Sequence, residues 1–358
     1  MPELTISRSH GPFELLAIAA IVVLPFLLAG CVSDERFKEI QTAKLLGVPV
    51  QKFPPSQGLT SFDELPSDAP SFKFEMRPAP IRGPEPRWSI GQTRLVSAVA
   101  PDGAIYEAYC GENDPKIIVP GHGFVSTLDN RRQRYGTLYF VAEYSPDDVY
   151  IGKRQQDGRI RPTLFFRDVG VHNDAPHSIA IDKAGHCHLI IADGNNFRKD
   201  RFDLYWMIGN PVSGKWENAF LIDGRDFISS PRPLVIASGD DIHLLWNRQA
   251  SRNEDQATES GLFYVERVGN HFGRKVRLIS GEVRSWDAAI DLRSGRVVAA
   301  ISRGDGVYVA SLVHHRWTRP TKLPVFEARE TDVVVTAASG GFLINTRLEQ
   351  RDYLLLPK

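Results

Sequence analysis

The sequence predicts an all-β fold, because one pattern of short strands recurs along most of the chain. Six segments share the order strand, turn with Gly or Asp, strand. β-Branched and aromatic residues fill the strands, as a pleated and partly buried surface requires. Asp and Gly at the turns supply the backbone shapes of a hairpin. The segments are 95–109, 124–144 with a longer turn, 178–193, 234–248, 288–303 and 333–347.

The hairpins are followed by further strands at a regular period. A third strand leads to an aromatic turn, which contains Trp216, Phe272 or Trp317, and a fourth strand follows. Second strands end at Asp193, Arg248 and Arg303, which are 55 residues apart. Four short strands at such a period are typical of a β-propeller blade. A two-sheet sandwich is the alternative, but the regular period and aromatic turn favour a propeller of five or six four-stranded blades.

The last repeat lacks an obvious fourth strand after residues 351–358. A segment before the repeats, 72–77 or 88–93, is expected to supply it. Placing both ends of the chain in one blade removes sheet edges that would otherwise invite aggregation.

The composition excludes several classes of function. The 358 residues carry 43 Lys and Arg against 43 Asp and Glu, so no positive field favours nucleic acid. Three cysteines cannot form a disulfide scaffold. The sequence contains no HExxH, CxxC, P-loop or Gly-x-Ser-x-Gly motif. We therefore predict no metal centre and no cofactor.

The N-terminal segment predicts export. Residues 15–30 are uncharged, contain Pro25, and are shorter than the roughly 20 residues that span a bilayer. A short apolar core followed by small residues is typical of a secretory signal. Its end, Leu28-Ala29-Gly30-Cys31, resembles the bacterial lipobox. The resemblance implies cleavage before Cys31 and lipid on its thiol; an uncleaved signal anchor is the alternative.

Three regions follow from these observations. Residues 1–30 are a lipoprotein signal peptide, 31–86 are a tether and lead-in, and 87–358 are the propeller. Nine prolines between positions 49 and 86 predict an extended lead-in. The expected location is the bacterial cell envelope, on the outer membrane or the periplasmic side, with the membrane bound through lipid on Cys31.

The repeat resembles the sialidase-type propellers and their BNR-repeat relatives. It has their strand order and the aromatic residue before the fourth strand, although no intact Asp-box occurs. Residues 139–154 and 171–190 are also similar to BNR-type propellers that include polysaccharide lyases acting on uronate-containing polymers. The resemblance implies a carbohydrate-active protein and leaves open whether this chain turns a substrate over.

Polar residues are expected to converge where first strands begin and second strands end, which is one face of a propeller. We call this face the mouth. Arginine presents a planar fork suited to carboxylates, and such a cluster resembles in kind the one that holds an acidic sugar in sialidase-like folds. The alternative is that these arginines only cap strand ends. The expected substrate-binding residues are Arg248, Arg303, Arg347, Asp193 and Trp286, and Arg232, Arg284 and Asp287 approach the same face.

Two hypotheses from different classes remain. The first is an enzyme on an acidic glycan: a lyase would use His172 or His177 as base and Tyr144 as acid, whereas a sialidase-like hydrolase would need a tyrosine nucleophile beside a carboxylate. Glu143 adjoins Tyr144, but neighbouring strand residues point to opposite faces. The second hypothesis is a non-catalytic propeller that binds a glycan or protein partner at the envelope, since fold alone does not fix function.

The remaining histidines and cysteines are expected to be structural. His186, His188 and His243 alternate with apolar residues inside second strands. Cys110 ends one second strand and Cys187 begins another, which separates them by about 20 Å of strand. Because a disulfide needs Cα atoms within about 7 Å, both are predicted to be free thiols.

Overall fold

The computed structural model describes only part of the chain. The described residues are 47–52, 74–78, 95–99, 104–110, 118–119, 123–124, 149–154, 156, 160–166, 177–195, 198–226, 232–248, 260–291, 294–324, 333–338, 341–346 and 351–357. The chain divides into two compact units, Met1–Val50 and Gln51–Lys358. The region boundaries predicted after residues 30 and 86 stay predictions.

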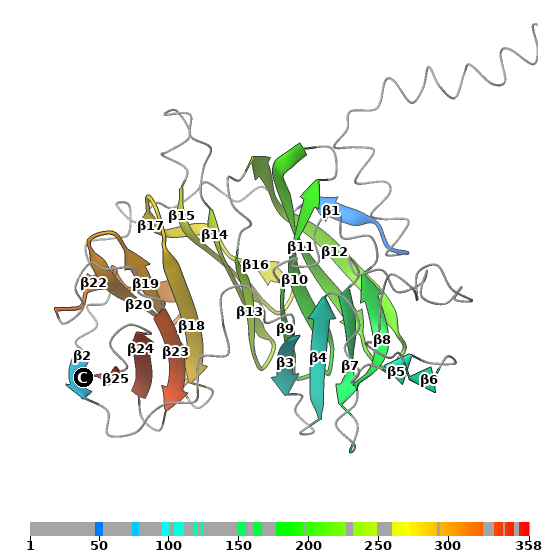
Figure 1. Cartoon of the computed structure of the whole chain (residues 1–358), viewed down its shortest axis with the longest axis horizontal. Coiled ribbons are helices and arrows are strands. Elements are labelled where there is room, and N and C mark those ends of the chain that lie inside the picture. Colours follow the sequence, from blue (N-terminus) through cyan, green and yellow to red (C-terminus); the bar gives the residue numbers. More distant parts are fainter. Residues whose placement is uncertain are drawn as a thin grey trace, which may run out of the picture. The chain divides into compact units, whose positions relative to one another are not determined.

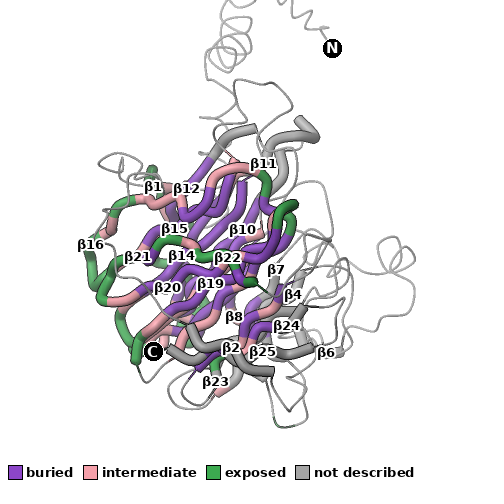
Figure 2. Tube along the Cα trace, turned by 90° about the vertical axis from the view of Figure 1, so that its left-hand side faces the viewer, coloured by how far each residue is buried: buried purple, intermediate pink, exposed green. Residues whose placement is uncertain are grey.

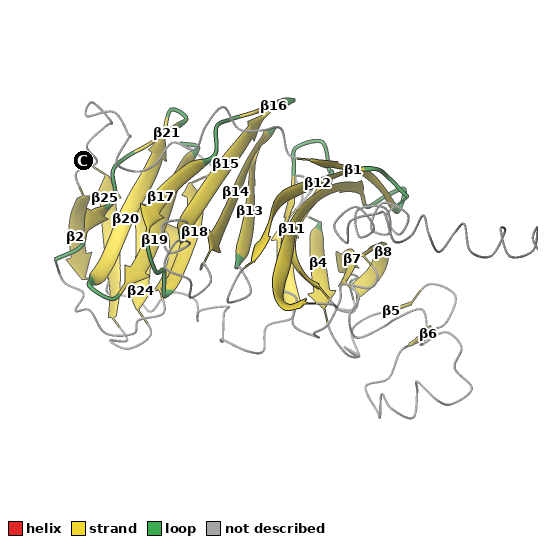
Figure 3. Ribbon diagram, turned by 90° about the horizontal axis from the view of Figure 1, so that it is seen from above, coloured by secondary structure: helices red, strands yellow, loops and turns green. Residues whose placement is uncertain are grey.

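Every regular element in the described residues is a β-strand, which confirms the all-β fold (Figure 3). Within those residues, no helix is long and apolar enough to cross a membrane.

Among the described residues, the strands form five larger antiparallel sheets, in which strands that follow one another in the chain are neighbours except for β1 and β2 (Figure 1). The first sheet holds β3 (Leu95–Val99), β4 (Ile105–Cys110), β7 (Val149–Arg154) and β8 (Ile160–Phe166). The second holds β9 (His177–Ile181), β10 (Cys187–Asn195), β11 (Arg198–Asn210) and β12 (Lys215–Asp226), with β1 (Val50–Lys52) beyond β12. The third holds β13 (Pro233–Ser238), β14 (Asp241–Arg248) and β15 (Gly261–Val268), followed by β16 (His271–Phe272) and β17 (Val276–Ser280).

The last two sheets continue the same order. The fourth sheet holds β18 (Ser285–Asp291), β19 (Arg296–Arg303) and β20 (Gly306–Val313), followed by β21 (Arg316–Trp317) and β22 (Thr321–Lys322). The fifth holds β23 (Val333–Ala338), β24 (Gly341–Thr346), β25 (Arg351–Pro357) and β2 (Phe74–Pro78). A separate pair joins β5 (Ile118–Val119) and β6 (Gly123–Phe124).

From the second sheet to the fifth, each sheet shares an apolar core with the next, and the third and fourth sheets are buried on both faces. In β19, Val297, Ala299 and Ile301 join a core with the third sheet, while Val298 and Ala300 join a core with the fifth. The first strands β3, β9, β13, β18 and β23 contact one another in this order. Figure 2 shows β14, β15, β19 and β20 buried over most of their length. Four-stranded meanders stacked in this way are the blades of a β-propeller.

The predicted hairpins form with defined registers. Leu95 pairs with Tyr109, Leu234 with Leu245, and Ala288 with Ala299. Of the segment 124–144, only Phe124 lies among the described residues. Because β4 pairs directly with β7, the first sheet has four strands without that segment. The choice between five and six blades therefore stays a prediction.

The lead-in supplies the outer strand of the last sheet. Phe74 in β2 pairs with Pro357, and Pro78 pairs with Tyr353. Of the two segments that the sequence offered for this strand, 72–77 overlaps β2 in residues 74–77, while 88–93 lies outside the described residues. The fifth sheet thus combines strands from both ends of the Gln51–Lys358 unit.

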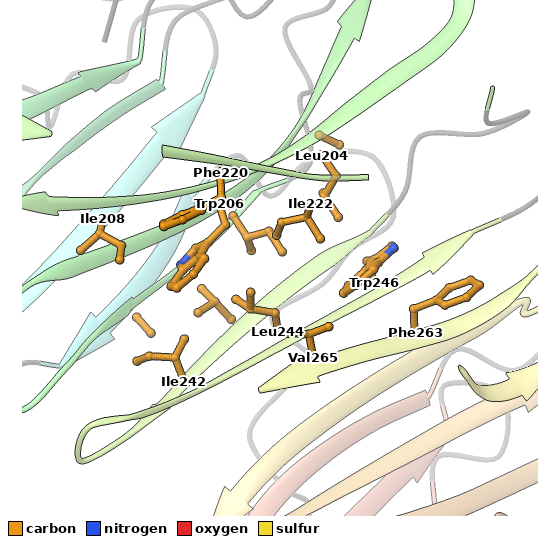
Figure 4. Close-up of a cluster of buried hydrophobic side chains, with 14 residues drawn as sticks. Leu204, Trp206, Ile208, Phe220, Ile222, Ile242, Leu244, Trp246, Phe263 and Val265 are labelled. Atoms are coloured by element: carbon orange, nitrogen blue, oxygen red, sulfur yellow. The ribbon is translucent and has the colours of Figure 1, made fainter. Parts of the chain in front are cut away.

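The aromatic turns pack against the preceding sheet. Trp216 Nε1 donates to the carbonyl oxygen of Phe165 at 2.7 Å. Phe272 meets Trp206 edge-on with ring centroids 5.7 Å apart, and Trp317 meets Tyr264 in the same way at 5.0 Å. Figure 4 shows the aromatic core between the second and third sheets, in which Trp206 and Phe220 lie close together. The recurrent aromatic residue of each turn (Trp216, Phe272 or Trp317) therefore packs between two neighbouring sheets, and we call these three residues the wedges.

The first strands are also linked by side chains. The Val235 amide donates to Ser178 Oγ at 3.2 Å, and the Val333 amide donates to Ser285 Oγ at 3.1 Å. In a third link the acceptor is a carboxylate: the Val335 amide donates to Asp287 Oδ2 at 2.8 Å. An amide at a strand edge has no ladder partner, and a buried amide needs an acceptor. Each of these side chains satisfies an amide of the next sheet.

The two cysteines lie where the sequence placed them, one at the end of β4 and one at the start of β10. Cys187 is buried and carries a free thiol, which confirms that prediction for Cys187 and excludes a bridge between it and Cys110. Burial raises the pKa of the Cys187 thiol.

Because the wedges are buried between sheets, we expect the loss of one of these aromatic rings to lower the free energy of unfolding strongly. Trp317 is 3% exposed, so Trp317→Ala leaves a cavity against Tyr264 and should lower the free energy of unfolding by about 3–5 kcal/mol. Val212 is 87% exposed, and Val212→Ala should change the same quantity by about 0.5 kcal/mol or less. Urea unfolding of both variants measures the difference, and equal midpoints would show that the wedge carries little stability.

Candidate functional site

Two of the predicted arginines occupy the same position in successive sheets. Arg248 is the last residue of β14 and pairs with Gly261, and Arg303 is the last residue of β19 and pairs with Gly306. Each lies seven residues after the first paired residue of its second strand, Asp241 or Arg296. The two arginines therefore lie at corresponding strand ends, where the mouth was expected.

Position 347 differs by one from the count that holds for Arg248 and Arg303. The hairpin of β23 and β24 closes with the pair Ala338 and Gly341, and seven residues after Gly341 is position 348 rather than 347. Neighbouring positions in a strand face opposite sides. Arg347 itself lies outside the described residues, so its place in the mouth stays a prediction.

The Arg303 side chain lies among charged and aromatic groups. Its Nε is 3.8 Å from Asp305 Oδ1, and its guanidinium lies 5.7 Å from the centre of the Tyr308 ring. The Tyr308 hydroxyl donates to Asp305 Oδ2 at 2.6 Å, and this bond, with the Arg303 charge, lowers the pKa of Asp305. Arg303 keeps about a third of its side chain exposed (32%), whereas Arg248 is 7% exposed.

Arg284 and Arg303 lie close together, each over a glycine next to the other, and we call them the crossed pair. Its amide donates to the Ser302 carbonyl at 3.0 Å, which fixes the loop before β18 against the end of β19. A Cβ at Gly304 would lie 3.3 Å from Arg284 Nη2, and a Cβ at Gly281 would lie 3.5 Å from Arg303 Nη2. Each guanidinium therefore lies over the glycine of the other arginine's loop. Within the described part of the chain, no carboxylate forms an ion pair with exposed Arg284.

Asp287 is a carboxyl group on a first strand. It lies in β18, two residues after the strand begins at the mouth, and is partly buried. Burial raises its pKa to about 7, although hydrogen bonds from the Val335 and Ala288 amides and the Arg232 charge act in the opposite direction. A carboxyl group with this pKa exchanges its proton near neutral pH, as groups at functional sites often do.

The equivalent residue in the second sheet is Ser178. Its partner Val235 and the Asp287 partner Val335 each lie three residues before the end of a first strand, at Ser238 and Ala338. The repeat thus has a hydroxyl at one copy of this position and a carboxyl at another. The sequence placed Asp287 near the mouth but gave it no role, because the equivalence follows only from the pairing.

The other predicted site residues have different placements. His177 is the first residue of β9 and is 6% exposed, and Asp193 pairs with Asp203. Trp286 is 6% exposed in the core between the third and fourth sheets, which assigns it to packing rather than to a surface where a sugar could stack. His172, Tyr144 and Cys31 lie outside the described residues.

Two histidines form polar links inside the sheets. His188 Nε2 lies 3.1 Å from Asp182 Oδ2, and its ring stacks on Trp206. His243 Nδ1 lies 2.9 Å from the Tyr264 hydroxyl, and its ring stacks on Tyr264. Burial lowers the pKa of both histidines, that of His243 to about 4. These contacts support the structural role that the sequence indicated, and no cluster suited to a metal ion occurs among the described residues.

No protein-family model matches the sequence, and no curated protein matches it. Similar solved structures include the Hadza microbial sialidase Hz136, with a TM-score of 0.40 at 9% identity over 74% of this chain and 52% of the sialidase. A GH43_1 enzyme from Xanthomonas citri has a TM-score of 0.34 at 12% identity, covering 74% of this chain and 86% of the enzyme. A PL25 ulvan lyase has a TM-score of 0.37 at 10% identity, covering 73% of this chain and 68% of the lyase.

A sialidase and a polysaccharide lyase, two of these three structures, are of the kinds that the repeat resembles in sequence. This chain spans about half the length of the sialidase. At identities and TM-scores this low, the likeness assigns no activity, substrate or residue role to this chain.

The raised pKa of Asp287 predicts a pH-dependent stability. A carboxyl whose pKa is about 7 when folded and about 3.9 when unfolded stabilises the fold below pH 4 relative to higher pH. Relative to Asp287→Asn, the wild-type free energy of unfolding should fall as pH rises from about 4 to 7, by up to about 1.4 kcal/mol for each pH unit, and then level off. Denaturant unfolding across this range measures the difference, and a constant difference would contradict the shift.

Proposed function

We propose that this chain is an exported, lipid-anchored propeller that recognises an acidic glycan at its mouth. The observation that carries the proposal is the crossed pair of Arg284 and Arg303. The two guanidinium groups can donate hydrogen bonds to a carboxylate or sulfate group. Asp305 engages Arg303 only at 3.8 Å, so a closer anion has donors left to bind.

The site also suits a sugar beyond its charged group. The Tyr308 ring lies beside the Arg303 guanidinium, and aromatic faces and polar edges together are common in sites that bind small molecules. An envelope protein with surface carboxylates would meet the same guanidinium groups and is the alternative partner. Cleavage of the glycan, by a lyase or a sialidase-like hydrolase, is a further hypothesis that the arginine pair does not require.

Removing the arginine pair should abolish recognition. Each lost charge-assisted hydrogen bond contributes about 1.5–3 kcal/mol, so Arg284→Ala and Arg303→Ala should each weaken binding roughly ten- to a hundredfold. Arg→Lys should not restore it, because an ammonium group lacks the planar fork. Affinity for oligogalacturonate, measured by calorimetry on residues 32–358, tests this.

The matched control is Arg316→Ala. Arg316 is an exposed arginine at the opposite end of β20, beyond the turn that follows Val313. Its removal changes net charge by the same amount and should leave affinity unchanged. Equal losses in the control and the two mouth variants would indicate a nonspecific charge effect, and binding of no acidic glycan would turn attention to a protein partner.

Lipid anchoring rests on the sequence Leu28-Ala29-Gly30-Cys31. Only a thiol accepts the thioether-linked lipid, and several acyl chains hold a protein stably where one gives marginal binding. In a bacterial host, Cys31→Ser should move the protein from the membrane fraction to the soluble envelope fraction. Mass spectrometry of the wild-type N-terminus should show a lipidated Cys31, and an intact unlipidated N-terminus would favour an uncleaved signal anchor.

A further inference from the structure

The turn that joins β19 to β20 has a cation over the glycine on each side of Asp305. A Cβ at Gly304 would lie 3.3 Å from Arg284 Nη2, and a Cβ at Gly306 would lie 3.4 Å from Lys322 Nζ. Asp305 is the residue between these two glycines. The turn at the mouth end of the fourth sheet therefore has two cationic positions, separated by one carboxylate.

Lys322 reaches this turn from the outer edge of the sheet. It lies in β22 and pairs with Tyr308 in β20. Its ammonium group lies over Gly306, which is two residues nearer the mouth and pairs with Arg303. Lys322 is exposed, so packing does not force its side chain toward the mouth. Its position there brings a further positive charge to the end of the sheet that carries the crossed pair.

The positive charge at this turn exceeds the negative charge. Asp305 Oδ1 lies 3.8 Å from Arg303 Nε, and Asp305 Oδ2 accepts a hydrogen bond from the Tyr308 hydroxyl at 2.6 Å. The bond from Tyr308 lowers the pKa of Asp305, and the charges of Arg303 and Lys322 lower it further. Asp305 is thus ionised at neutral pH, but it is a single carboxylate beside Arg284, Arg303 and Lys322.

A second carboxylate lies in the neighbouring loop without pairing with these cations. Glu282 is exposed and, within the part of the chain that the structure describes, forms no ion pair. The loop therefore leaves the excess of positive charge at the turn available to an anionic ligand.

The third sheet contains the same arrangement in a more buried form. Arg248 pairs with Gly261, and Phe263, two residues further along β15, pairs with Arg277. A Cβ at Gly261 would lie 3.3 Å from Arg277 Cγ and Cδ. Arg248 is 7% exposed and Arg277 is partly buried. The corresponding residues of the fourth sheet are Arg303, Gly306, Tyr308 and Lys322.

A basic residue of the outer strand over this glycine is thus a repeated feature of the two sheets. The copies differ in access, because Arg303 keeps about a third of its side chain exposed and Lys322 is exposed. The copy in the fourth sheet is therefore the one that a ligand can reach.

We propose that Lys322 binds a second anionic group of the glycan, so that the mouth takes a polyanionic chain in which neighbouring sugars each carry a carboxylate or a sulfate. This inference rests on the proposed function and names the class of ligand for the same site. An anion placed between the two cationic positions would be repelled by Asp305. One anionic group therefore belongs beside the crossed pair and another beside Lys322, and a glycan with a single acidic sugar supplies only one of them.

The test compares probes that carry one anionic group with probes that carry many. Galacturonate and hexagalacturonate form the carboxylate arm, glucose 6-sulfate and sulfated dextran form the sulfate arm, and neutral dextran is the uncharged control. Calorimetry on the full chain, purified in detergent, gives the affinity for each polymer, and competition against the polymer gives that for each monosaccharide. The arm in which the polymer binds more tightly than its monosaccharide identifies the oxyanion.

Removal of Lys322 should affect the polymer alone. Lys322→Ala and Lys322→Gln should each weaken polymer binding about tenfold, the lower end for a charge-assisted hydrogen bond because Lys322 is exposed, and should leave monosaccharide binding unchanged. Arg303→Ala should weaken the binding of both. Lys322→Arg should keep the polymer affinity, because an ammonium group acts here as a point charge and no planar fork is required.

Two controls separate ligand binding from other effects of charge. Lys215 is an exposed lysine at the far end of the second sheet, where it pairs with Asn210, and Lys215→Ala should leave polymer affinity unchanged. If Lys322 binds the glycan, Lys322→Ala should have the same tenfold effect in an Asp305→Asn background. If Lys322 only offsets the Asp305 charge, its removal should have no effect in that background.

The outcomes distinguish the inference from the proposed function. Polymer affinity that is unchanged in Lys322→Ala, or a loss that is equal for polymer and monosaccharide, overturns the second anion position. A loss that disappears in the Asp305→Asn background overturns it as well. In each case the proposed function stands if Arg303→Ala still weakens binding. If wild type binds no anionic probe, the proposed function fails and the inference fails with it.

Discussion

The packing of one sheet on the next is the constraint on which the rest of this structure depends. A four-stranded sheet has two faces, and in β19 both are apolar, so neither face can be left in water. Burial contributes about 25 cal/mol for each Å² of apolar surface removed from water, which is available only when a neighbouring sheet covers it. Trp216, Phe272 and Trp317, each at the outer edge of its sheet, contact the third or fourth strand of the preceding sheet.

This stacking also determines where function can reside. Side chains inside the sheets, such as Trp286 and His188, are committed to packing or to internal hydrogen bonds. Side chains at strand ends are not required for packing between sheets, and the loops between sheets bring several strand ends together. Arg284 and Arg303 come from loops on either side of one hairpin, and the glycines beneath them let both guanidinium groups approach the backbone. The repeat supplies the scaffold, and single residues at its ends supply the chemistry.

Local pattern was sufficient to predict the hairpins and the closing strand, because alternation and turn residues act within a few positions. It was insufficient for the arginines, since turn length differs between hairpins. Two residues separate Ser238 from Asp241, but four separate Asp291 from Arg296. Gly239 and Gly295 both have positive φ, yet they stand at different points of their turns. Counting from the paired residues shows that Arg248 and Arg303 share a position in the repeat, whereas the place of Arg347 stays a prediction.

The links between first strands explain why a repeat can change function without losing its fold. An edge amide needs an acceptor, and Ser178, Ser285 and Asp287 each provide one from the preceding sheet. Because the requirement is only for an acceptor oxygen, hydroxyl and carboxyl groups both meet it. Pro233, the first residue of β13, has no amide hydrogen, so at this position no acceptor is needed. A position whose structural demand is this permissive can carry a proton-exchanging group, and at Asp287 the chain has one beside the mouth.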